Sequence, residues 1–399
     1  MSTMTRTDTD TRYALFAGLC ATFVGIGLAR FSYAPLIPAL VGAHWLTPGA
    51  AAYLGATNFA GYLLGSWSSQ VVGRKVGIRF ALRMAMLLTG LSFLACAWPL
   101  SELWLSVWRF IAGFTGGLLM VLAAPGILAR LPAARRGLAG GVIFTGIGLG
   151  IAIAGGLLPL LLRFGLREVW LTFGGLTLLL TLLSWGGWQE GAPAADAATP
   201  PAAPPREARK ALRTLYVEYG LNAFGLVPHF VFFVDFVARG LDRGLSAGAG
   251  LWVVFGLGAC LGPLAAGSLA DRIGFRDALR LSYALQLIAV LLPLVYVGNA
   301  GLALSALIAG ASVPGVVTLA LGRTQELLSD DGARRKAWRN CSVIFAIAQA
   351  GGAYLLSYVF AQTHDYAILF AFGAVALAVG LLLDLVMLRG RERPAPSQA

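Results

Sequence analysis

Residues 267–276 of the 399-residue chain read Gly267-Ser268-Leu269-Ala270-Asp271-Arg272-Ile273-Gly274-Phe275-Arg276. This short charged segment stands between two long apolar blocks, near residues 246 to 269 and 277 to 298. A helix needs roughly 20 apolar residues to cross about 30 Å of hydrocarbon. The segment is therefore expected to be a loop between two membrane-spanning helices. Gly274 permits a tight turn there, and Asp271 can cap a neighbouring helix N-terminus or pair with an arginine.

Similar apolar blocks fill most of the chain. Hydrophobic residues make up 58% of the sequence and charged residues only 12%, whereas an ordinary soluble domain carries about a quarter charged residues. A soluble fold of this length could not cover its surface with so few charges. We therefore predict an all-α integral membrane protein with twelve transmembrane helices. They lie near residues 13–40, 49–72, 79–99, 103–129, 138–162, 168–188, 213–238, 246–269, 277–298, 301–323, 338–361 and 366–388.

The twelve blocks form two sets of six. Between the sets, residues 190–213 contain a run rich in proline and alanine, followed by Arg206, Arg209, Lys210 and Arg213. Because this segment lacks apolar periodicity, it is expected to be a flexible linker. We predict an N-terminal six-helix bundle over residues 1–189, a cytoplasmic linker over 190–213 and a C-terminal six-helix bundle over 214–399.

The net charge of +12 would suggest a nucleic-acid partner in a soluble protein. Here most of the 30 lysines and arginines fall in the tails, the linker and the loops of one side of the predicted membrane protein. Cytoplasmic loops of membrane proteins carry such an excess of cations. We therefore expect both termini to be cytoplasmic, the chain to be a multi-pass protein of the plasma membrane (the inner membrane of a bacterium), and no nucleic acid to bind. The loops of the other side hold only Arg163, Arg167, Arg239 and Arg243.

The loop at 267–276 resembles G-x3-D-R-x-G-R/K, the loop signature of the major facilitator superfamily (MFS). The resemblance implies the MFS fold of two pseudo-symmetric six-helix bundles. In the equivalent loop of the first half, Arg74 stands in place of the aspartate and Gln70 in place of the first glycine. A latch between the halves is thus expected to depend on the second loop. Its gating residues would be Asp271, Arg272, Gly274 and Arg276.

The sequence of the first helix indicates a particular branch of the superfamily. Its pattern Gly25-x-Gly27-x-x-Arg30-Phe31-x-Tyr33-x-Pro35-x-x-Pro38 is similar to the opening of the YbfB-like (YbfB/YjiJ) branch of the superfamily, and the similarity extends over nearly the whole chain. The branch implies the fold and indicates no particular cargo. On the fourth helix, Leu105-x3-Arg109-x3-Gly113 resembles the buried-arginine motif of the superfamily.

The fifth helix is rich in glycine and resembles the exporter glycine motif in part. Ile151 stands where that motif has proline, and the last glycine pair is out of step. Glycines at such spacing also allow close packing between membrane helices. The glycines in question are Gly146, Gly148, Gly150, Gly155 and Gly156.

Ionisable side chains inside membrane helices are costly unless they face a cavity or a partner, so each is a candidate site residue. On the seventh helix, Glu218, Asn222 and His229 share one face. Nearly the same number of residues separates Arg30 from Gly77 as separates His229 from Gly274, which places the two side chains at similar depths. We expect Arg30 and His229 to face a midplane cavity from opposite sides. The predicted substrate-binding residues are Arg30, Tyr33, Arg109, Asn222, His229 and Gln349, and the predicted proton-coupling residues are His229, Glu218 and Asp235.

Structural roles remain open for each of these residues. Arg30 and Arg109 can instead bond backbone carbonyls or a carboxylate, and His229 can bond the carbonyls that Pro228 frees. Glu218 can be wet surface, and Asp235 can form a helix-end ion pair with Arg239. Gln349, Asn58 and Tyr62 can donate hydrogen bonds to the cargo or form hydrogen bonds between helices.

We predict a permease that moves a small organic solute by alternating access, with an anionic solute and proton coupling favoured. A proton-coupled exporter of drugs or metabolites and a non-transporting membrane sensor are the alternatives. An enzyme is not expected, because the three histidines and scattered carboxylates form no convergent catalytic set. The four cysteines stand singly, without the spacing of a metal site or disulfide framework. We expect no cofactor and no metal; the partners are a small molecule, the coupling proton and the lipid bilayer, with the chain a monomer.

Overall fold

The computed structural model describes residues 2–132, 135–188 and 205–387, and the regular elements in these ranges are helices. The first half contains α1 (Ser2–Thr22), the π-helical segment η1 (Phe23–Leu28), α2 (Tyr33–Gly42), α3 (Pro48–Val76), α4 (Ile78–Cys96), α5 (Glu102–Leu128), α6 (Arg136–Leu161) and α7 (Leu166–Ser184). The second half contains α8 (Arg206–Gly225), the π-helical segment η3 (Pro228–Phe232), α9 (Phe233–Asp235), the π-helical segment η4 (Phe236–Gly240), α10 (Gly244–Ile273), α11 (Phe275–Val295), α12 (Asn299–Leu327), α13 (Asp331–Thr363) and α14 (Tyr366–Met387).

Each predicted apolar block coincides with a helix or a series of helical segments. In the described part of the chain, 11 of these are long and apolar enough to cross a membrane. The block formed by α3 is not among them, and it carries Asn58 and a polar run from Ser66 to Gln70. The twelfth crossing, by α3, stays a prediction.

The first predicted helix is interrupted. The chain passes from α1 into η1, turns at residues 29–32 and continues as α2. Gly27 lies in η1 at the point where this segment meets α6, and a Cβ on Gly27 would lie 2.8 Å from the Gly150 Cα. Short π-helical segments are rare in proteins, and those that occur are often found at functional sites. The block at 213–238 is interrupted in the same way, by η3 and η4.

The predicted linker is shorter than expected. Helix α8 already begins at Arg206, so the four cations assigned to the linker lie in its first turns. Pro205 directly precedes this helix. The rest of the predicted linker before residue 205, and the basic C-terminal tail with Arg389, Arg391 and Arg393, lie outside the described residues.

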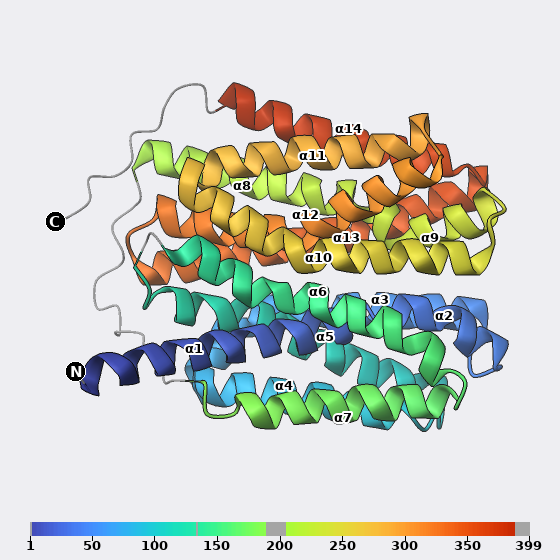
Figure 1. Ribbon diagram of the computed structural model, residues 1–399, viewed down its shortest axis with the longest axis horizontal. Helices are drawn as coiled ribbons and strands as arrows, with labels where there is room; N and C mark the ends of the chain where they lie inside the picture. Colours follow the sequence, from blue (N-terminus) through green and yellow to red (C-terminus); the bar gives the residue numbers. More distant parts are fainter. Residues whose placement is uncertain (1, 133–134, 189–204, 388–399) are drawn as a thin grey trace.

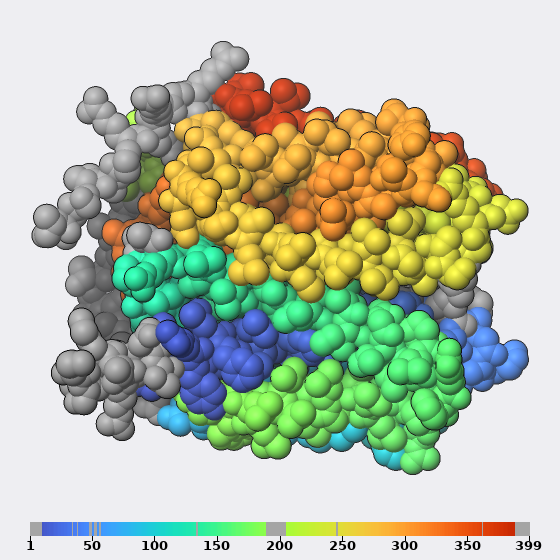
Figure 2. All heavy atoms as spheres, viewed as in Figure 1, coloured from blue at the N-terminus to red at the C-terminus, as the bar shows by residue number. Residues whose placement is uncertain are grey.

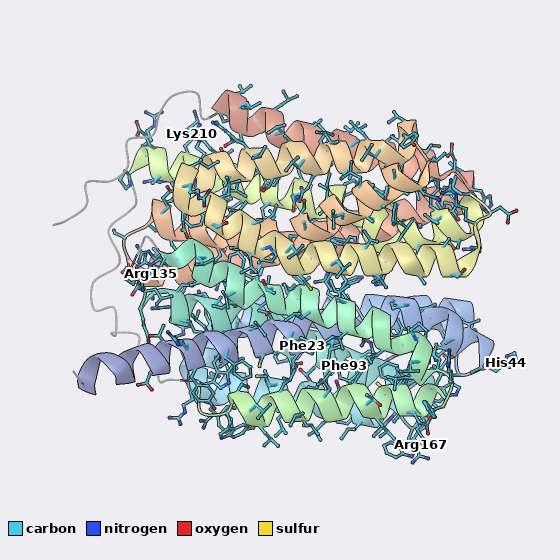
Figure 3. The ribbon with its side chains drawn as sticks, in the orientation of Figure 1. Phe23, His44, Phe93, Arg135, Arg167 and Lys210 are labelled. Carbon is cyan, nitrogen blue, oxygen red and sulfur yellow. The ribbon has the colours of Figure 1, made fainter. Side chains whose placement is uncertain are left out.

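The two halves of the chain lie side by side, α1–α7 in the lower half of Figure 1 and α8–α14 in the upper half. Helix α1 begins and α14 ends at the left of this view, and we call this the termini end of the molecule. Figure 3 shows Arg135 and Lys210 at the termini end, and His44 and Arg167 at the opposite end.

Helices α6 and α10 form the closest seam between the halves, and Figure 2 shows them in contact along their length on one face of the molecule. The seam depends on glycine. A Cβ on Gly267 would lie 2.2 Å from the Gly137 carbonyl oxygen, and a Cβ on Gly148 would lie 2.1 Å from the Ala259 carbonyl carbon. Small residues let the backbones of membrane helices approach this closely.

Candidate functional site

Arg30 lies where the two halves meet, directly after η1. Its Nη2 donates a hydrogen bond to Oε1 of Gln349 on α13, across the interface. Its guanidinium also stacks over the rings of Phe59, at 4.6 Å, and Tyr62, at 4.8 Å, both on α3. Among the described residues, no carboxylate forms an ion pair with Arg30. The side chain is thus a half-buried positive charge held by two aromatic faces and one neutral amide.

Arg109 occupies a separate position inside the first half. It is 2% exposed, and its Nη1 donates to the carbonyl oxygen of Ala29 at 2.9 Å. This carbonyl belongs to the turn between η1 and α2. The guanidinium lies 4.4 Å from the ring centre of Tyr33, whose hydroxyl donates to the Ala51 carbonyl at 2.8 Å. Arg109 therefore supports the broken first helix next to Arg30, the structural alternative for this residue.

Asn58 serves the same part of the first half. Its Nδ2 donates to the Arg109 carbonyl oxygen at 3.0 Å, which joins α3 to α5. The side chain is buried. Asn58 is thus a link between α3 and α5.

Aromatic residues close the interface between Arg30 and the termini end. Trp338 of α13 is 0% exposed, and its Nε1 donates to the Met120 carbonyl oxygen of α5 at 3.2 Å. The rings of Phe144, on α6, and Tyr219, on α8, both lie 6.4 Å from the Trp338 ring. We call Trp338, Met120, Phe144 and Tyr219 the termini-side contact.

A second aromatic contact joins the halves next to Arg30. Phe31, next to Arg30, lies 5.8 Å from Phe230 of η3 between ring centres. Phe230 in turn lies 6.2 Å from Phe255 of α10. This Phe31–Phe230 contact is thus next to Arg30 in the chain, whereas the termini-side contact includes Trp338, which precedes Gln349 on α13.

His229 lies inside the second half. Its Nε2 is 2.8 Å from the Ser305 hydroxyl oxygen, and that hydroxyl donates to the Ala289 carbonyl at 2.7 Å. Because the single hydroxyl proton is used in this way, Nε2 is the donor to Ser305. The imidazole packs against Phe233 at 5.0 Å and Phe370 at 5.4 Å.

The structure does not bring His229 and Arg30 together. The side-chain hydrogen bond and ring contacts of His229 are with Phe233 of α9, Ser305 of α12 and Phe370 of α14, whereas those of Arg30 are with residues of α3 and α13. His229 also bonds a side chain rather than the carbonyls near Pro228. Its role in binding or proton transfer stays a prediction.

The other predicted residues of the seventh block also face their own half. Nδ2 of Asn222 donates to Oε1 of Gln286 on α11. Asp235 forms the expected ion pair with Arg239 and also accepts a hydrogen bond from the Tyr366 hydroxyl at 2.6 Å. These contacts match the structural alternative for Asp235.

Asp271 caps a helix of the other half. Its Oδ1 accepts from the backbone N–H of Gly137 at 3.1 Å, and its Oδ2 accepts from that of Leu138 at 2.9 Å, in the first turn of α6. Gly274 has φ +87°, the left-handed conformation expected for a tight turn. Arg272 is exposed and Arg276 is partly buried.

Helix α13 is the equivalent of α6 in the second half, and a residue of its own half caps its N-terminus. The N-terminus of α13 is capped by its own Asp330, whose Oδ2 accepts from the Ala333 N–H at 2.6 Å. The loop of the first half carries Arg74 where its aspartate would stand. The capping between the halves is thus one-sided, as the two loop sequences predict.

The structure therefore brings Arg30 and Gln349 together, places Arg109 against Tyr33 at the turn between η1 and α2, and leaves Asn222 and His229 apart. Sequence reasoning missed Phe59, Tyr219 and Trp338. Within an apolar helix these aromatic residues have no pattern that separates them from lipid-facing ones. In the described ranges, no group of three or more histidine, cysteine, aspartate or glutamate side chains is placed to hold a metal ion.

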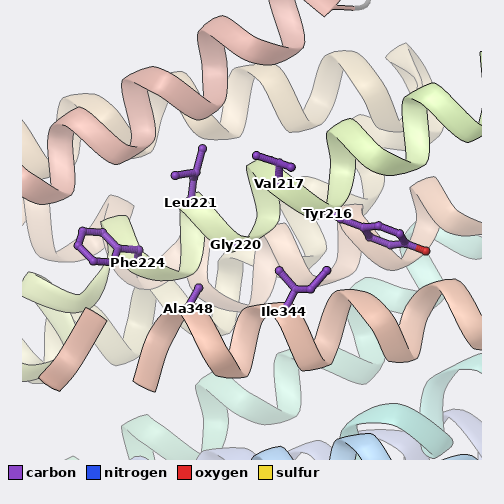
Figure 4. A pocket seen from close by; sticks show the side chains of 7 residues that line it. All are labelled: Tyr216, Val217, Gly220, Leu221, Phe224, Ile344 and Ala348. Atoms are coloured by element: carbon purple, nitrogen blue, oxygen red, sulfur yellow. The ribbon is translucent and has the colours of Figure 1, made fainter. Parts of the chain in front are cut away.

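A wholly apolar groove of about 340 Å³ lies on another face of α8, between this helix and α13 (Figure 4). Gly220, which has no side chain, is one of its lining residues, and Val217 in the same lining is half exposed. A charged solute would find no partner there. The groove is lined by Tyr216, Val217, Gly220, Leu221, Phe224, Ile344 and Ala348.

Comparison with solved structures identifies the fold. The chain superposes on the crystal structure of the human organic anion transporter MFSD10 (TETRAN) with a TM-score of 0.72 and 17% identity, over 94% of this chain and 99% of that one. It superposes on the MFS transporter FucP in the outward conformation with a TM-score of 0.71 and 15% identity, over the same shares of the two chains. At these identities the similarity establishes the fold alone.

Comparison at the level of sequence identifies the family. A search of curated proteins finds no match to the chain. The family model described as "Uncharacterised MFS-type transporter YbfB" matches residues 22–385, which is most of the sequence. The chain therefore belongs to the YbfB-like family of the major facilitator superfamily, and it is a multi-pass membrane transporter.

Proposed function

We propose that the protein is a proton-coupled permease that carries a small organic anion by alternating access. In this proposal the chain crosses a plasma membrane twelve times, with α3 as the remaining crossing, and the termini end faces the cytoplasm. Arg30 binds the negative charge of the cargo, and Gln349 and Tyr62 contact its polar groups.

The observation that carries the proposal is the setting of Arg30. A cation–π contact contributes about 0.5–2 kcal/mol, and a hydrogen bond in which one partner is charged contributes about 1.5–3 kcal/mol. Burial of a charge within a membrane protein costs more than these contacts return unless a counter-charge is present. Since the described part of the chain offers Arg30 no carboxylate, an anion from outside would complete the site. The planar guanidinium can bind a carboxylate through two parallel hydrogen bonds.

The two aromatic contacts between the halves support alternating access. Each joins residues of different halves. Phe31 follows Arg30 in the chain, and Trp338 precedes Gln349, the hydrogen-bond partner of Arg30, on α13. Opening one contact while the other stays closed would expose Arg30 to one side of the membrane at a time.

Organic anions are also the cargo named for MFSD10. The incomplete glycine motif of α6 disfavours the exporter alternative, because Ile151 stands in place of its proline. A sensor that does not transport would share the Arg30 site but would not exchange its ligand across a membrane.

The test begins with the purified full-length chain. A ligand that binds only the native state raises apparent stability, so thermal-shift screening against small carboxylates, sulfonates and phosphates would find a cargo candidate. Counterflow of that compound in proteoliposomes would then separate a carrier from a sensor. Stabilisation by cations only, or binding without counterflow, would contradict the proposal.

A further inference from the structure

The second half contains a buried acidic residue that the cargo site does not use. Glu218 of α8 is 4% exposed, and its Oε2 has no hydrogen-bond donor among the described residues. The charged groups nearest to it belong to α11, α12 and α14. A Cβ on Gly380 of α14 would lie 3.8 Å from the Glu218 Cα.

The charged groups around Glu218 are largely engaged with other acids. Arg280 of α11 forms ion pairs with Asp384 and Asp277. Arg323 of α12 forms an ion pair with Glu326 at 2.6 Å. The ionisable groups that face Glu218 are Arg276, Arg280 and Tyr283 on α11, Arg323 on α12, Cys341 on α13 and Asp384 on α14.

The two buried acids of this cluster, Glu218 and Asp384, differ in whether an arginine pairs with them. Asp384 is 4% exposed, like Glu218, but it is neutralised by Arg280. A second negative charge beside Asp384 would be repelled by it and would lack a donor for Oε2. An unpaired buried carboxylate is much more costly than a neutral carboxyl group. Glu218 is therefore the acid of this cluster that holds a proton in the conformation described.

We propose that Glu218 is the proton-binding site of the transporter, separate from the cargo site; this rests on the proposed proton-coupled transport and names its titrating group. In the binding step an Oε–H bond forms with a proton taken from hydronium or water, and the reverse step returns it to water. The reaction needs no other co-reactant.

The geometry also links Glu218 to the termini-side contact. The next residue, Tyr219, packs against Trp338 and lies 5.0 Å from Phe345 of α13. Loss of the proton would create a negative charge that competes with Asp384 for Arg280. The resulting rearrangement of α8 against α11 and α14 would move Tyr219 and loosen the contact with Trp338. Protonation thus favours the closed termini side, and deprotonation favours its opening.

The two other predicted proton carriers are less suited to this role. His229 is fixed by Ser305 and enclosed by Phe233 and Phe370. Asp235 is neutralised by Arg239 and receives a hydrogen bond from Tyr366. Neither has a contact with a residue of the termini-side contact among those that the structure describes.

The first test measures the proton directly in the purified full chain without cargo. Infrared difference spectra between neutral and alkaline buffer should show loss of a protonated-carboxyl band in the wild type. The band should be absent in Glu218→Gln and present in Asp384→Asn. A wild type without such a band, or a band that survives in Glu218→Gln, would overturn the assignment.

Thermal unfolding gives a second readout that does not depend on the Asp384 variant. A proton held by the native state but lost by the unfolded chain makes stability fall as pH rises. The melting temperature of the wild type should thus fall from neutral to alkaline pH, and Glu218→Gln should show a shallower fall. The Glu207→Gln variant, which changes an exposed glutamate in the first turn of α8, should keep the wild-type profile. Equal slopes in the wild type and Glu218→Gln would overturn the assignment.

The proposed link between Glu218 and the termini-side contact can be measured separately, by the accessibility of a cysteine at the interface. Thr318 of α12 is buried at the interface, where a Cβ on Gly140 of α6 would lie 3.3 Å from its Cγ2. In a chain whose native cysteines are replaced, the rate of reaction of Thr318→Cys with maleimide, divided by the rate for a small free thiol at the same pH, should be several-fold higher at alkaline than at neutral pH. The added Glu218→Gln change should abolish this increase; an increase that persists would refute the link. None of these experiments uses a cargo. Failure of counterflow would therefore contradict the proposed transport function, whereas the proton site is decided by the three experiments described here.

Discussion

Asp271 of α10 accepts hydrogen bonds from the N–H groups of Gly137 and Leu138 in α6, so one half of the molecule caps a helix of the other. A carboxylate at a helix N-terminus pairs with unsatisfied N–H groups and with the positive end of the helix dipole. The cap lies at the termini end, and separation of the halves there must break it. Asp271 is thus placed to favour the closed termini side.

The Asp271→Asn variant should open this side more often. The amide keeps one acceptor oxygen but loses the second acceptor and the negative charge, whose interaction with the helix dipole contributes about 0.3–1 kcal/mol. Maleimide labelling of Thr318→Cys should therefore speed up several-fold. Asp330→Asn is the matched control, because it weakens a cap within one half, and it should leave labelling unchanged. Equal labelling in Asp271→Asn and its parent would count against the latch.

The α6–α10 seam predicts opposite effects for two glycines of one helix. Gly148→Ala would place a Cβ 2.1 Å from the Ala259 backbone and force the helices apart. Gly156 has no atom within 4 Å of the equivalent position. Since alanine favours a helix over glycine by about 1 kcal/mol, Gly156→Ala should keep or raise the melting temperature, whereas Gly148→Ala should lower it. A Gly148→Ala variant as stable as Gly156→Ala would show that the seam is looser than described.

Trp338 predicts a graded opening of the termini-side contact. Trp338→Phe loses the hydrogen bond to the Met120 carbonyl, worth about 1 kcal/mol, and Trp338→Ala also loses a large buried ring, worth about 3–5 kcal/mol. Labelling at Thr318→Cys should rise in the first variant and rise further in the second. Trp170→Phe changes a tryptophan buried within the first half and should affect stability alone. Labelling that rises as much in Trp170→Phe would mean that general loosening, not the contact, was measured.

The proposed topology can be checked without a cargo. Reporters fused after Ala194 and at the C-terminus should report the cytoplasm, because most lysines and arginines lie on that side. Reporters inserted at His44 and Arg167, at the opposite end, should report the outside. An outside signal from Ala194 or the C-terminus would refute twelve crossings with this orientation.

Local sequence features predicted the parts of the molecule that depend on neighbouring residues. The apolar blocks correspond to helices, the Asp271 loop forms a cap, Gly274 has a positive φ, and Asp235 pairs with Arg239. Each follows from chain length, backbone freedom or a spacing of four residues. These properties do not require knowledge of which helices meet.

The rest of the site depends on which helices meet. Glu218, Asn222 and His229 share a face of the seventh block, but their sequence does not state that this face packs on α11 and α14 rather than on Arg30. In a membrane, lipid-facing and protein-facing positions are both apolar, so Trp338 and Phe59 carry no distinguishing pattern. The π-helical turn before Arg30 was likewise hidden in an uninterrupted apolar run.

Binding of an anionic cargo to Arg30 is the central claim, and affinity in the Arg30→Lys variant tests it most directly. Lysine keeps the charge but cannot bind a carboxylate through two parallel hydrogen bonds or stack as a plane on Phe59 and Tyr62. For a cargo found by thermal shift, titration of the purified variant should give an affinity about tenfold weaker or worse, a loss of about 1.4 kcal/mol. Arg109→Lys, which alters the support of the Ala29 turn, should lower stability more than affinity for the cargo. An Arg30→Lys variant with wild-type affinity, or a cargo that proves to be a cation, would contradict the account.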